Sequence, residues 1–372
     1  MPYVRGIALL LVSAGVPWAA DSVFERILAP ASSSSIRKTE AAIVELKDGR
    51  LLLAYTDFYT VFPRDDAPAR ILGRHSSDQG RTWSRPFVMV ENTAKQNVMS
   101  VSLLRLASGE LAMTYMFKNS HERLGEPDPQ GPDCSVLFRI SRDEGKTFSS
   151  PVTITPQRSF WVMNNDRLVQ LKSGRLLAPC QRLDNWPMVR HSLTQVLYSD
   201  DHGKTWSGSQ LVDIRTNPDG ADEPGVVELK DGRVLMYFRT DLGRIYQAFS
   251  SDQGVTWTTP EPMTLAAPVS PAIIKRIPST GDLLIVWNHT LPHRRGGHTD
   301  RFPLSAAVSR DEGRTWQIRD LDTDVRFTFG YPSLTFVKDR VLVTYWAAKD
   351  WPWWVSLKLK ALPASWFYEQ GD

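Results

Sequence analysis

Five eight-residue segments of this chain share one pattern, Ser-x-Asp-x-Gly-x-Thr followed by Trp or Phe. They start at Ser76, Ser141, Ser199, Ser250 and Ser309, between about 50 and 65 residues apart. A repeat at such a period is typical of stacked supersecondary units. Ser and Asp side chains bond nearby backbone N–H groups and Gly takes a positive φ, so each segment predicts a tight turn.

A second repeat consists of an apolar strand, a turn that usually contains Gly, and another apolar strand. Its six copies, each predicting a β-hairpin, are residues 43–55, 103–115, 168–180, 226–238, 273–287 and 334–346. Five of them are followed by a Ser-x-Asp segment, which gives each unit the four strands of a propeller blade. The sixth is not, so we expect the amino-terminal strand around residues 23–28 to complete it. The prediction is an all-β, six-bladed β-propeller.

Composition and charge exclude several classes of protein. The formal net charge is +3, too small and too dispersed for a nucleic-acid-binding surface. No interior stretch reaches the roughly 18 apolar residues of a membrane span.

Residues 1–20 resemble a secretory signal peptide, with Arg5 before an apolar run, although Trp18 breaks the small-residue rule at the cleavage site. A disordered or buried amino terminus is the alternative. We expect a secreted or periplasmic monomer with one domain, residues 21–372.

The two cysteines and a group of histidines bear on disulfides and metals. Cys134 and Cys180 can form one disulfide or remain two buried thiols, and they cannot build a zinc site. His289, His293 and His298 lie close in sequence but lack carboxylate ligands at a fixed spacing. We therefore predict no metal and no cofactor.

The residues just before the first strand of each blade surround one mouth of a propeller, where ligands usually bind. Counting back six residues from the end of each first strand gives Glu40, Ser100, Asn165, Glu223, Pro271 and Tyr331. Two carboxylates, an amide and a phenol fit glycosidic chemistry, which needs an acid, a nucleophile or base, and polar contacts to hydroxyls. A sugar-binding module without catalysis fits them as well.

The Ser-x-Asp segments resemble the Asp-boxes of the sialidase superfamily, and the resemblance covers nearly the whole chain after residue 20. It implies a propeller with these boxes at the outer hairpins. It also implies a site with three arginines, a Tyr–Glu pair and an Asp.

The implied residues can be placed one by one. Glu223 precedes a first strand and Arg239 ends the second strand of the same hairpin, as in the family. Arg301 lies before the strand that leads into the last Asp-box. Tyr331 opens a segment similar to the family's Tyr-Ser-x-Leu, with Pro332 replacing the residue after tyrosine, and is the candidate nucleophile.

Two parts of the family's residue pattern match this chain less closely. The family's Arg-Ile-Pro appears as Arg37-Lys38-Thr39, which makes Arg37 the third arginine. The acid/base Asp corresponds to Asp65 or Asp66, of which Asp66 is the closer match. An ordinary acidic loop would explain the same pair.

The resemblance implies an exo-sialidase that acts with retention of configuration. Arginines recognise the carboxylate of sialic acid by bidentate hydrogen bonds, and a tyrosine nucleophile avoids repulsion by that carboxylate. Tyr331 would attack, activated by Glu223, while Asp66 protonates the leaving oxygen.

Four mouth residues are not explained by the family pattern. We expect Glu40, Asn165, Asp166 and Arg167 to contact substrate and to alter its identity. A glycosidase or lyase acting on uronic acids is favoured if Arg37 fails to reach the other two arginines, or if Glu40 occupies the place of a sialic acid side chain. A non-catalytic carbohydrate-binding or protein-binding propeller is the remaining alternative.

Overall fold

The computed structural model describes residues 23–62, 64–120, 131–185, 189–290, 301–349 and 354–369. The predicted signal peptide lies outside these residues. Within the described residues, no helix has the length and apolar character to span a membrane. Apart from the short 3₁₀ helix η2 (Ala364–Tyr368), the named elements are strands.

The strands form four hydrogen-bonded sheets. The first contains β1 (Phe24–Ala29), β2 (Arg37–Glu45), β3 (Leu51–Phe58), β4 (Ala69–Ser76), β5 (Phe87–Val90), β23 (Thr328–Val337), β24 (Arg340–Ala348) and β25 (Val355–Pro363). The second contains β6 (Asn97–Arg105), β7 (Leu111–Lys118), β8 (Cys134–Ser141), β9 (Val152–Thr153), β10 (Phe160–Val162), β11 (Val169–Gln170), β12 (Leu176–Leu183), β13 (Leu193–Ser199) and β14 (Ser207–Gly208).

The two remaining sheets have four strands each. One runs β15 (Asp222–Glu228), β16 (Val234–Arg239), β17 (Arg244–Ser250) and β18 (Glu261–Ala266). The other runs β19 (Ile273–Arg276), β20 (Leu283–Asn288), β21 (Leu304–Ser309) and β22 (Gln317–Asp322). All six predicted hairpins are present as antiparallel pairs, namely β2–β3, β6–β7, β11–β12, β15–β16, β19–β20 and β23–β24.

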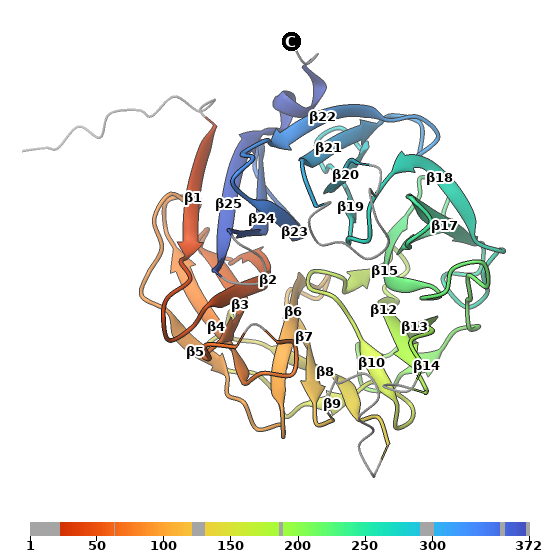
Figure 1. The fold of residues 1–372 in the computed structure, drawn as a ribbon, viewed down its shortest axis with the longest axis horizontal. Helices are drawn as coiled ribbons and strands as arrows, with labels where there is room; N and C mark the ends of the chain where they lie inside the picture. Colours follow the sequence, from red (N-terminus) through yellow and green to blue (C-terminus); the bar gives the residue numbers. More distant parts are fainter. Residues whose placement is uncertain are drawn as a thin grey trace, which may run out of the picture.

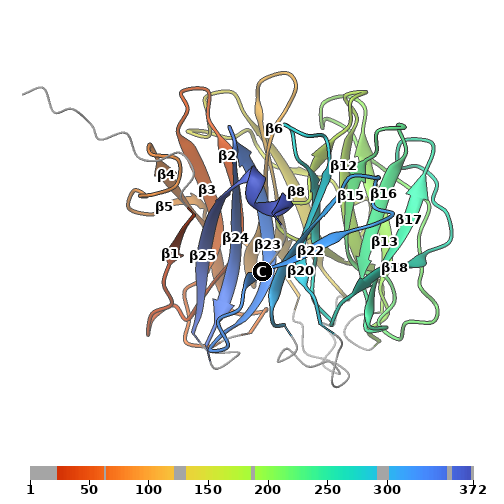
Figure 2. The same cartoon turned by 90° about the horizontal axis from the view of Figure 1, so that it is seen from above.

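The units follow one another around a common centre in chain order (Figure 1). Strands run between two faces that carry the loops (Figure 2). The expected pairing of the amino-terminal strand is confirmed, because β1 lies antiparallel to β25 with Phe24 opposite Ala361. The fold is all-β and β-propeller-like. Single parallel contacts, Arg37 with Val355 and Phe160 with Cys134, join neighbouring units into larger sheets, so the count of six blades stays a prediction.

Apolar layers hold successive units together. One buried cluster combines side chains of β2 and β3 with those of β6 and β7, among them Ala42, Leu52, Val101 and Met113. Another combines β15 and β16 with β19 and β20, among them Val227, Leu235, Ile274 and Ile285. Each strand of these hairpins therefore buries apolar surface against the next unit, which fixes the inner strands that carry the mouth residues.

The five Ser-x-Asp segments, called the repeat turns below, share one hydrogen-bond pattern. In the third, Gly203 N donates to Ser199 Oγ (2.9 Å) and Thr205 donates to Asp201 from its backbone (2.9 Å) and its hydroxyl (2.6 Å). The glycine has a φ of 83°, as predicted, and the preceding His202 is also left-handed with a φ of 62°. Each repeat turn connects the last two strands of its unit, as between β13 and β14, and not the strands of the six predicted hairpins.

Candidate active site

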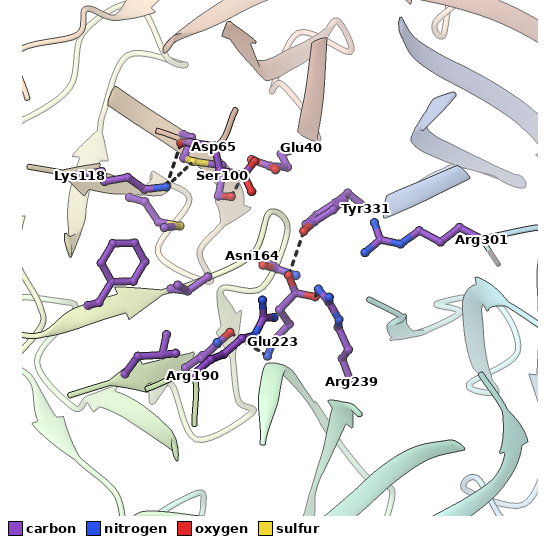
Figure 3. Close-up of a pocket in the computed structure, with 16 residues that line it drawn as sticks. Glu40, Asp65, Ser100, Lys118, Asn164, Arg190, Glu223, Arg239, Arg301 and Tyr331 are labelled. Atoms are coloured by element: carbon purple, nitrogen blue, oxygen red, sulfur yellow. Dashed lines mark hydrogen bonds and ion pairs between the residues drawn. The ribbon is translucent and has the colours of Figure 1, made fainter. Parts of the chain in front are cut away.

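A pocket opens where β2, β6, β15 and β23 begin (Figure 3). Its polar lining comes from Glu40, Asp65, Ser100, Lys118, Asn164, Gln181, Arg190, Glu223, Arg239, Arg301 and Tyr331. Its apolar lining comes from Met99, Met116, Phe160, Val162 and Leu183. Four of the six positions predicted by strand register are therefore in the lining: Glu40, Ser100, Glu223 and Tyr331.

The backbone explains why these positions converge. Glu40, Ser100, Glu223 and Tyr331 have φ between 41° and 56°, in the left-handed region. At each, the pairing of the first strand with the second shifts register, as at a β-bulge. Bulges re-aim side chains, and left-handed non-glycine residues are strained and concentrate at functional sites.

Tyr331 and Glu223 form a hydrogen-bonded pair at the centre of the pocket. Tyr331 Oη donates to Glu223 Oε1 at 3.0 Å. Burial, reinforced by the Glu223 carboxylate, raises the pKa of Tyr331 far above its ordinary value. Burial opposes ionisation of Glu223, but Arg239 and Arg301 outweigh it and hold the pKa of Glu223 below its ordinary value. The arrangement is a neutral phenol beside an ionised acceptor.

Arg239 and Arg301 lie beside this pair (Figure 3). Arg239 Nη1 bonds Glu223 Oε2 at 2.5 Å, and its Nε has no acceptor among the described residues. Arg301 is 1% exposed, donates to Val269 O at 3.0 Å and 3.2 Å, and its Nη1 also lacks an acceptor among them. Burial, followed by the positive charge of Arg239, lowers the pKa of Arg301 to about 10. Both arginines carry donors that an anion would satisfy.

Arg37 is placed differently from the other two arginines. Its Nη1 bonds Asp65 and its Nη2 lies 3.3 Å from Glu40 Oε1, while its guanidinium covers the ring of Phe58 at 4.5 Å. It is 4% exposed and is not part of the pocket lining. Because the carboxylates of Asp65 and Glu40 already pair with its guanidinium, this placement does not support the expectation that Arg37 binds substrate.

Glu40 lies on the pocket side of Arg37. Its Oε2 accepts a hydrogen bond from Ser100 Oγ at 2.8 Å, and it is 1% exposed. Burial raises the pKa of Glu40 to about 7, although the positive charge of Arg37 opposes the shift. The sequence prediction that Glu40 faces the mouth agrees with its place in the lining.

Of the two candidate acids, the structure places Asp65, and not the preferred Asp66, in the pocket lining. Asp65 lines the pocket with its side chain 53% exposed. Asp66 does not line the pocket, and its carboxylate pairs with Arg64.

Asn165, Asp166 and Arg167 are buried and do not line the pocket, so the structure gives no support to the prediction that they contact substrate. Asn165 donates to Ala41 O, Asp166 pairs with Lys275, and Arg167 donates to Ala272 O. Asp166, with a φ of 58°, occupies the left-handed position that the register count assigned to Asn165. The three side chains connect inner strands to one another, and their neighbour Asn164 lines the pocket instead.

Sequence reasoning missed Lys118, Gln181 and Arg190. Lys118 ends β7 and is 1% exposed, with its Nζ 3.1 Å from Asp65 O. Gln181 stands near the end of β12 and accepts from Glu223 N at 3.3 Å. Arg239 also ends a second strand, so the strand-end position would have found Lys118, whereas Gln181 lies two residues before the end of β12. No comparable signal exists for Arg190, which reaches Asp222 from a connection.

Cys134 and Cys180 are both buried free thiols. No group of three or more His, Cys, Asp or Glu side chains suited to a metal ion occurs among the described residues. His293 and His298 lie outside those residues, so the prediction about the histidine loop remains a prediction.

The comparisons with known proteins agree with this fold. A family model described as a BNR repeat-like domain matches residues 120–343. The chain belongs to this family. It is 28% identical to a sialidase of Bacteroides fragilis over 242 residues, covering 61% of this chain and 42% of that protein. It is 28% identical to a sialidase of Micromonospora viridifaciens over 306 residues, covering 74% and 45%. The predicted resemblance to the sialidase superfamily is confirmed.

A solved structure gives the same picture. The intramolecular trans-sialidase from Ruminococcus gnavus, in complex with oseltamivir carboxylate, matches with a TM-score of 0.73 at 16% identity, covering 93% of this chain and 99% of that one. This likeness supports the fold. The chain spans about half the length of the curated sialidases it matches.

Proposed function

We propose that this chain is an exo-acting, sialidase-like glycoside hydrolase, built as a six-bladed propeller, which removes terminal sialic acid from glycans with retention of configuration. The observation that carries the proposal is the hydrogen bond from Tyr331 Oη to Glu223 Oε1, at 3.0 Å, beside Arg239 and Arg301. The sialidases to which the chain is similar support the same activity.

The charges of the pocket favour an anionic sugar. Its lining has four cationic side chains and three carboxylates: Lys118, Arg190, Arg239 and Arg301 against Glu40, Asp65 and Glu223. Arg239 and Arg301 each keep a buried N–H group without an acceptor among the described residues, and guanidinium groups bind carboxylates with charge-assisted hydrogen bonds.

The proposed reaction has two displacements. In the first, the Tyr331 oxygen attacks the anomeric carbon and gives its proton to Glu223, while the leaving oxygen takes a proton from Asp65. In the second, water attacks the same carbon and gives a proton to Asp65, and the Tyr331 oxygen leaves and is reprotonated by Glu223. Two inversions retain the configuration. Asp65 takes the role that the sequence assigned to Asp66.

A uronic-acid glycosidase or lyase is the second candidate. The sequence favoured this candidate if Arg37 failed to reach the other two arginines, and the absence of Arg37 from the pocket lining agrees with that condition. The carboxylate of a uronic acid would use the same two arginines.

Secretion or periplasmic localisation also remains a proposal, carried by the pattern of residues 1–20.

The test uses a fluorogenic α-sialoside and the matching β-glucuronide with the wild-type chain, Tyr331→Phe and the control Tyr345→Phe. Tyr345 is buried and donates to Asp322 at 2.7 Å, away from the pocket. Release from the sialoside that is lost in Tyr331→Phe and kept in Tyr345→Phe supports the proposal. Release from the glucuronide alone favours the second candidate, and release from neither contradicts both and favours a binding propeller.

A further inference from the structure

Asp65 lies in the connection between β3 and β4 and reaches the pocket outside any regular strand. Its side chain is 53% exposed, so the surrounding side chains do not enclose its carboxyl group. The place of that group at the pocket therefore depends on how the backbone of the connection is held. A general acid needs such a hold, because a displacement of about 1 Å can cost about a hundredfold in rate.

Two side chains of the next unit hold that backbone. Asn97 Nδ2 donates to Asp65 O at 2.7 Å and to Ala67 O at 2.8 Å. Lys118 Nζ donates to the same Asp65 O at 3.1 Å (Figure 3). The carbonyl of Asp65 thus accepts two hydrogen bonds, and the connection is bonded on both sides of Asp66.

Asn97 and Lys118 lie opposite each other at the ends of two paired strands. Asn97 begins β6, Lys118 ends β7, and the two residues are partners in register. They are 0% and 1% exposed. Lys118 Nζ also lies 3.5 Å from Met99 Sδ and 5.5 Å from the centre of the Phe160 ring. Because hydrogen-bonded polar groups buried in this way are held rigidly, the anchor of Asp65 belongs to the sheet rather than to the connection.

The charge of Lys118 acts on the pocket as well. Lys118 is part of the lining, and its Nζ is bonded to the backbone of the proposed acid. Burial raises the pKa of Glu40, and the positive charges of Arg37 and Lys118 oppose that shift. A nearby opposite charge favours the ionised form of a carboxyl group. Lys118 should therefore favour the Asp65 carboxylate that forms when the leaving oxygen takes the proton.

We propose that Asn97 and Lys118 are positioning residues for Asp65, which fix its backbone carbonyl so that its carboxyl group stays at the pocket. The charge of Lys118 then contributes to the pH at which the acid loses its proton. This inference rests on the proposed function, because it concerns the proton given to the leaving group of that reaction. Both residues act through Asp65, so their effect should be confined to the step that uses the acid.

The leaving group separates this role from a merely structural one. A 4-nitrophenyl α-sialoside has a leaving group that departs without a proton, whereas methyl α-sialoside needs the acid. In the full chain, Asn97→Ala should lower kcat/KM for the methyl sialoside by about ten- to a hundredfold, and for the nitrophenyl sialoside by less than about threefold.

Asn288→Ala is the matched control. Asn288 is also 0% exposed, ends β20, and donates from Nδ2 to a backbone carbonyl, that of Pro303. This variant loses a buried hydrogen bond of the same kind, but it should leave the ratio of the two kcat/KM values as in wild type.

The pH profile tests the charge of Lys118. The titratable and charged groups around Asp65 are Arg64 and Asp66 in its own connection, Arg37 and Glu40 on β2, Lys118 on β7, Arg301 before β21 and Tyr331 on β23. The acid has to be protonated, so kcat/KM for the methyl sialoside falls as the pH rises through the pKa of Asp65. Lys118→Met removes a cation and should move this fall to higher pH by about one unit, while Lys118→Arg should keep it in place. The nitrophenyl sialoside should show no such displacement, which separates Asp65 from Glu40.

Several results would overturn the inference and leave the proposed function standing. They are equal losses on both sialosides in Asn97→Ala, an unmoved profile in Lys118→Met, and a wild type that hydrolyses the nitrophenyl sialoside alone and so lacks a working acid. If Asn97→Ala does not fold, the profiles of Lys118→Met and Lys118→Arg decide. If wild type hydrolyses neither sialoside, the proposed function fails and this inference fails with it.

Discussion

The repeat turns and the pocket use the same side chains at very different separations along the chain. In the third repeat turn, Ser199, Asp201, Gly203 and Thr205 form hydrogen bonds between residues two to four positions apart. In the pocket, Tyr331 and Glu223 are 108 residues apart, and Ser100 and Glu40 are 60 apart. The turns are local devices that the sequence encodes directly, whereas the pocket exists only once the units are assembled.

The two regions also shift pKa values by different physical causes. Hydrogen bonds from Thr147 and Ser141 lower the pKa of Asp143, in the second repeat turn, to about 2. Burial raises the pKa of Glu40 and of Tyr331 in the pocket. Changes in the turns should therefore alter stability, and changes in the pocket should alter chemistry.

The largest expected effect is a difference in kcat between variants of two adjacent aspartates, Asp65 and Asp66. Asp65→Asn should lower kcat by about 10² to 10⁴, because it removes a general acid at the pocket. Asp66→Asn should change kcat little, since Asp66 pairs with Arg64 outside the lining. Steady-state kinetics with a sialoside that has a poor leaving group measures both. A larger loss of kcat in Asp66→Asn than in Asp65→Asn would identify Asp66, the residue favoured by the sequence, as the general acid.

Substitutions of two glycines, Gly203 in the third repeat turn and Gly232 in the β15–β16 turn, test the expected effect on the free energy of unfolding. At Gly203, with a φ of 83°, an added Cβ would lie 2.2 Å from the ring of Phe138. At Gly232, with a φ of 86°, it would meet nothing within 4 Å. Gly203→Ala should cost about 3 kcal/mol from strain and overpacking together, and Gly232→Ala about 1 kcal/mol from strain. Urea unfolding gives both values, and equal costs would show that packing against Phe138 contributes nothing.

The smallest expected effect is an acid dependence of stability. The pKa of Asp143 is about 2 in the folded chain against an ordinary value of 3.8, so its stabilising contribution is present above 3.8 and is lost as the pH falls towards 2. The melting temperature should fall over this range, and less steeply in Asp143→Asn. Kinetics near neutral pH should be the same for both chains. An identical acid slope in the variant would contradict this role of the turn.

The features that could be predicted from the sequence are likewise the local ones. The six hairpins and the turn geometry could be predicted because apolar alternation and the Ser-x-Asp segments act locally. Strand register placed Glu40, Ser100, Glu223 and Tyr331, since each lies at a fixed offset before an inner strand. It missed by one residue at Asp166, where a two-residue β11 gives a short pattern from which to count.

Contacts between distant segments could not be predicted. Arg37 matches an anion-binding arginine by motif, but its partner Asp65 comes from a separate loop, and the choice between Asp65 and Asp66 depends on the direction of one side chain. Arg190 joins the lining from a connection without a regular pattern. These positions depend on tertiary packing rather than on local sequence.

The most direct test of the account is to trap the proposed covalent intermediate with a 3-fluorosialosyl fluoride. Fluorine beside the anomeric carbon slows both displacements, and the fluoride leaving group lets the first proceed. The proposed mechanism predicts that intact mass rises by one fluorosialosyl group and that peptide mapping places it on Tyr331, with no labelling of Tyr331→Phe. Turnover of a sialoside without any adduct, or with an adduct on another residue, would contradict it.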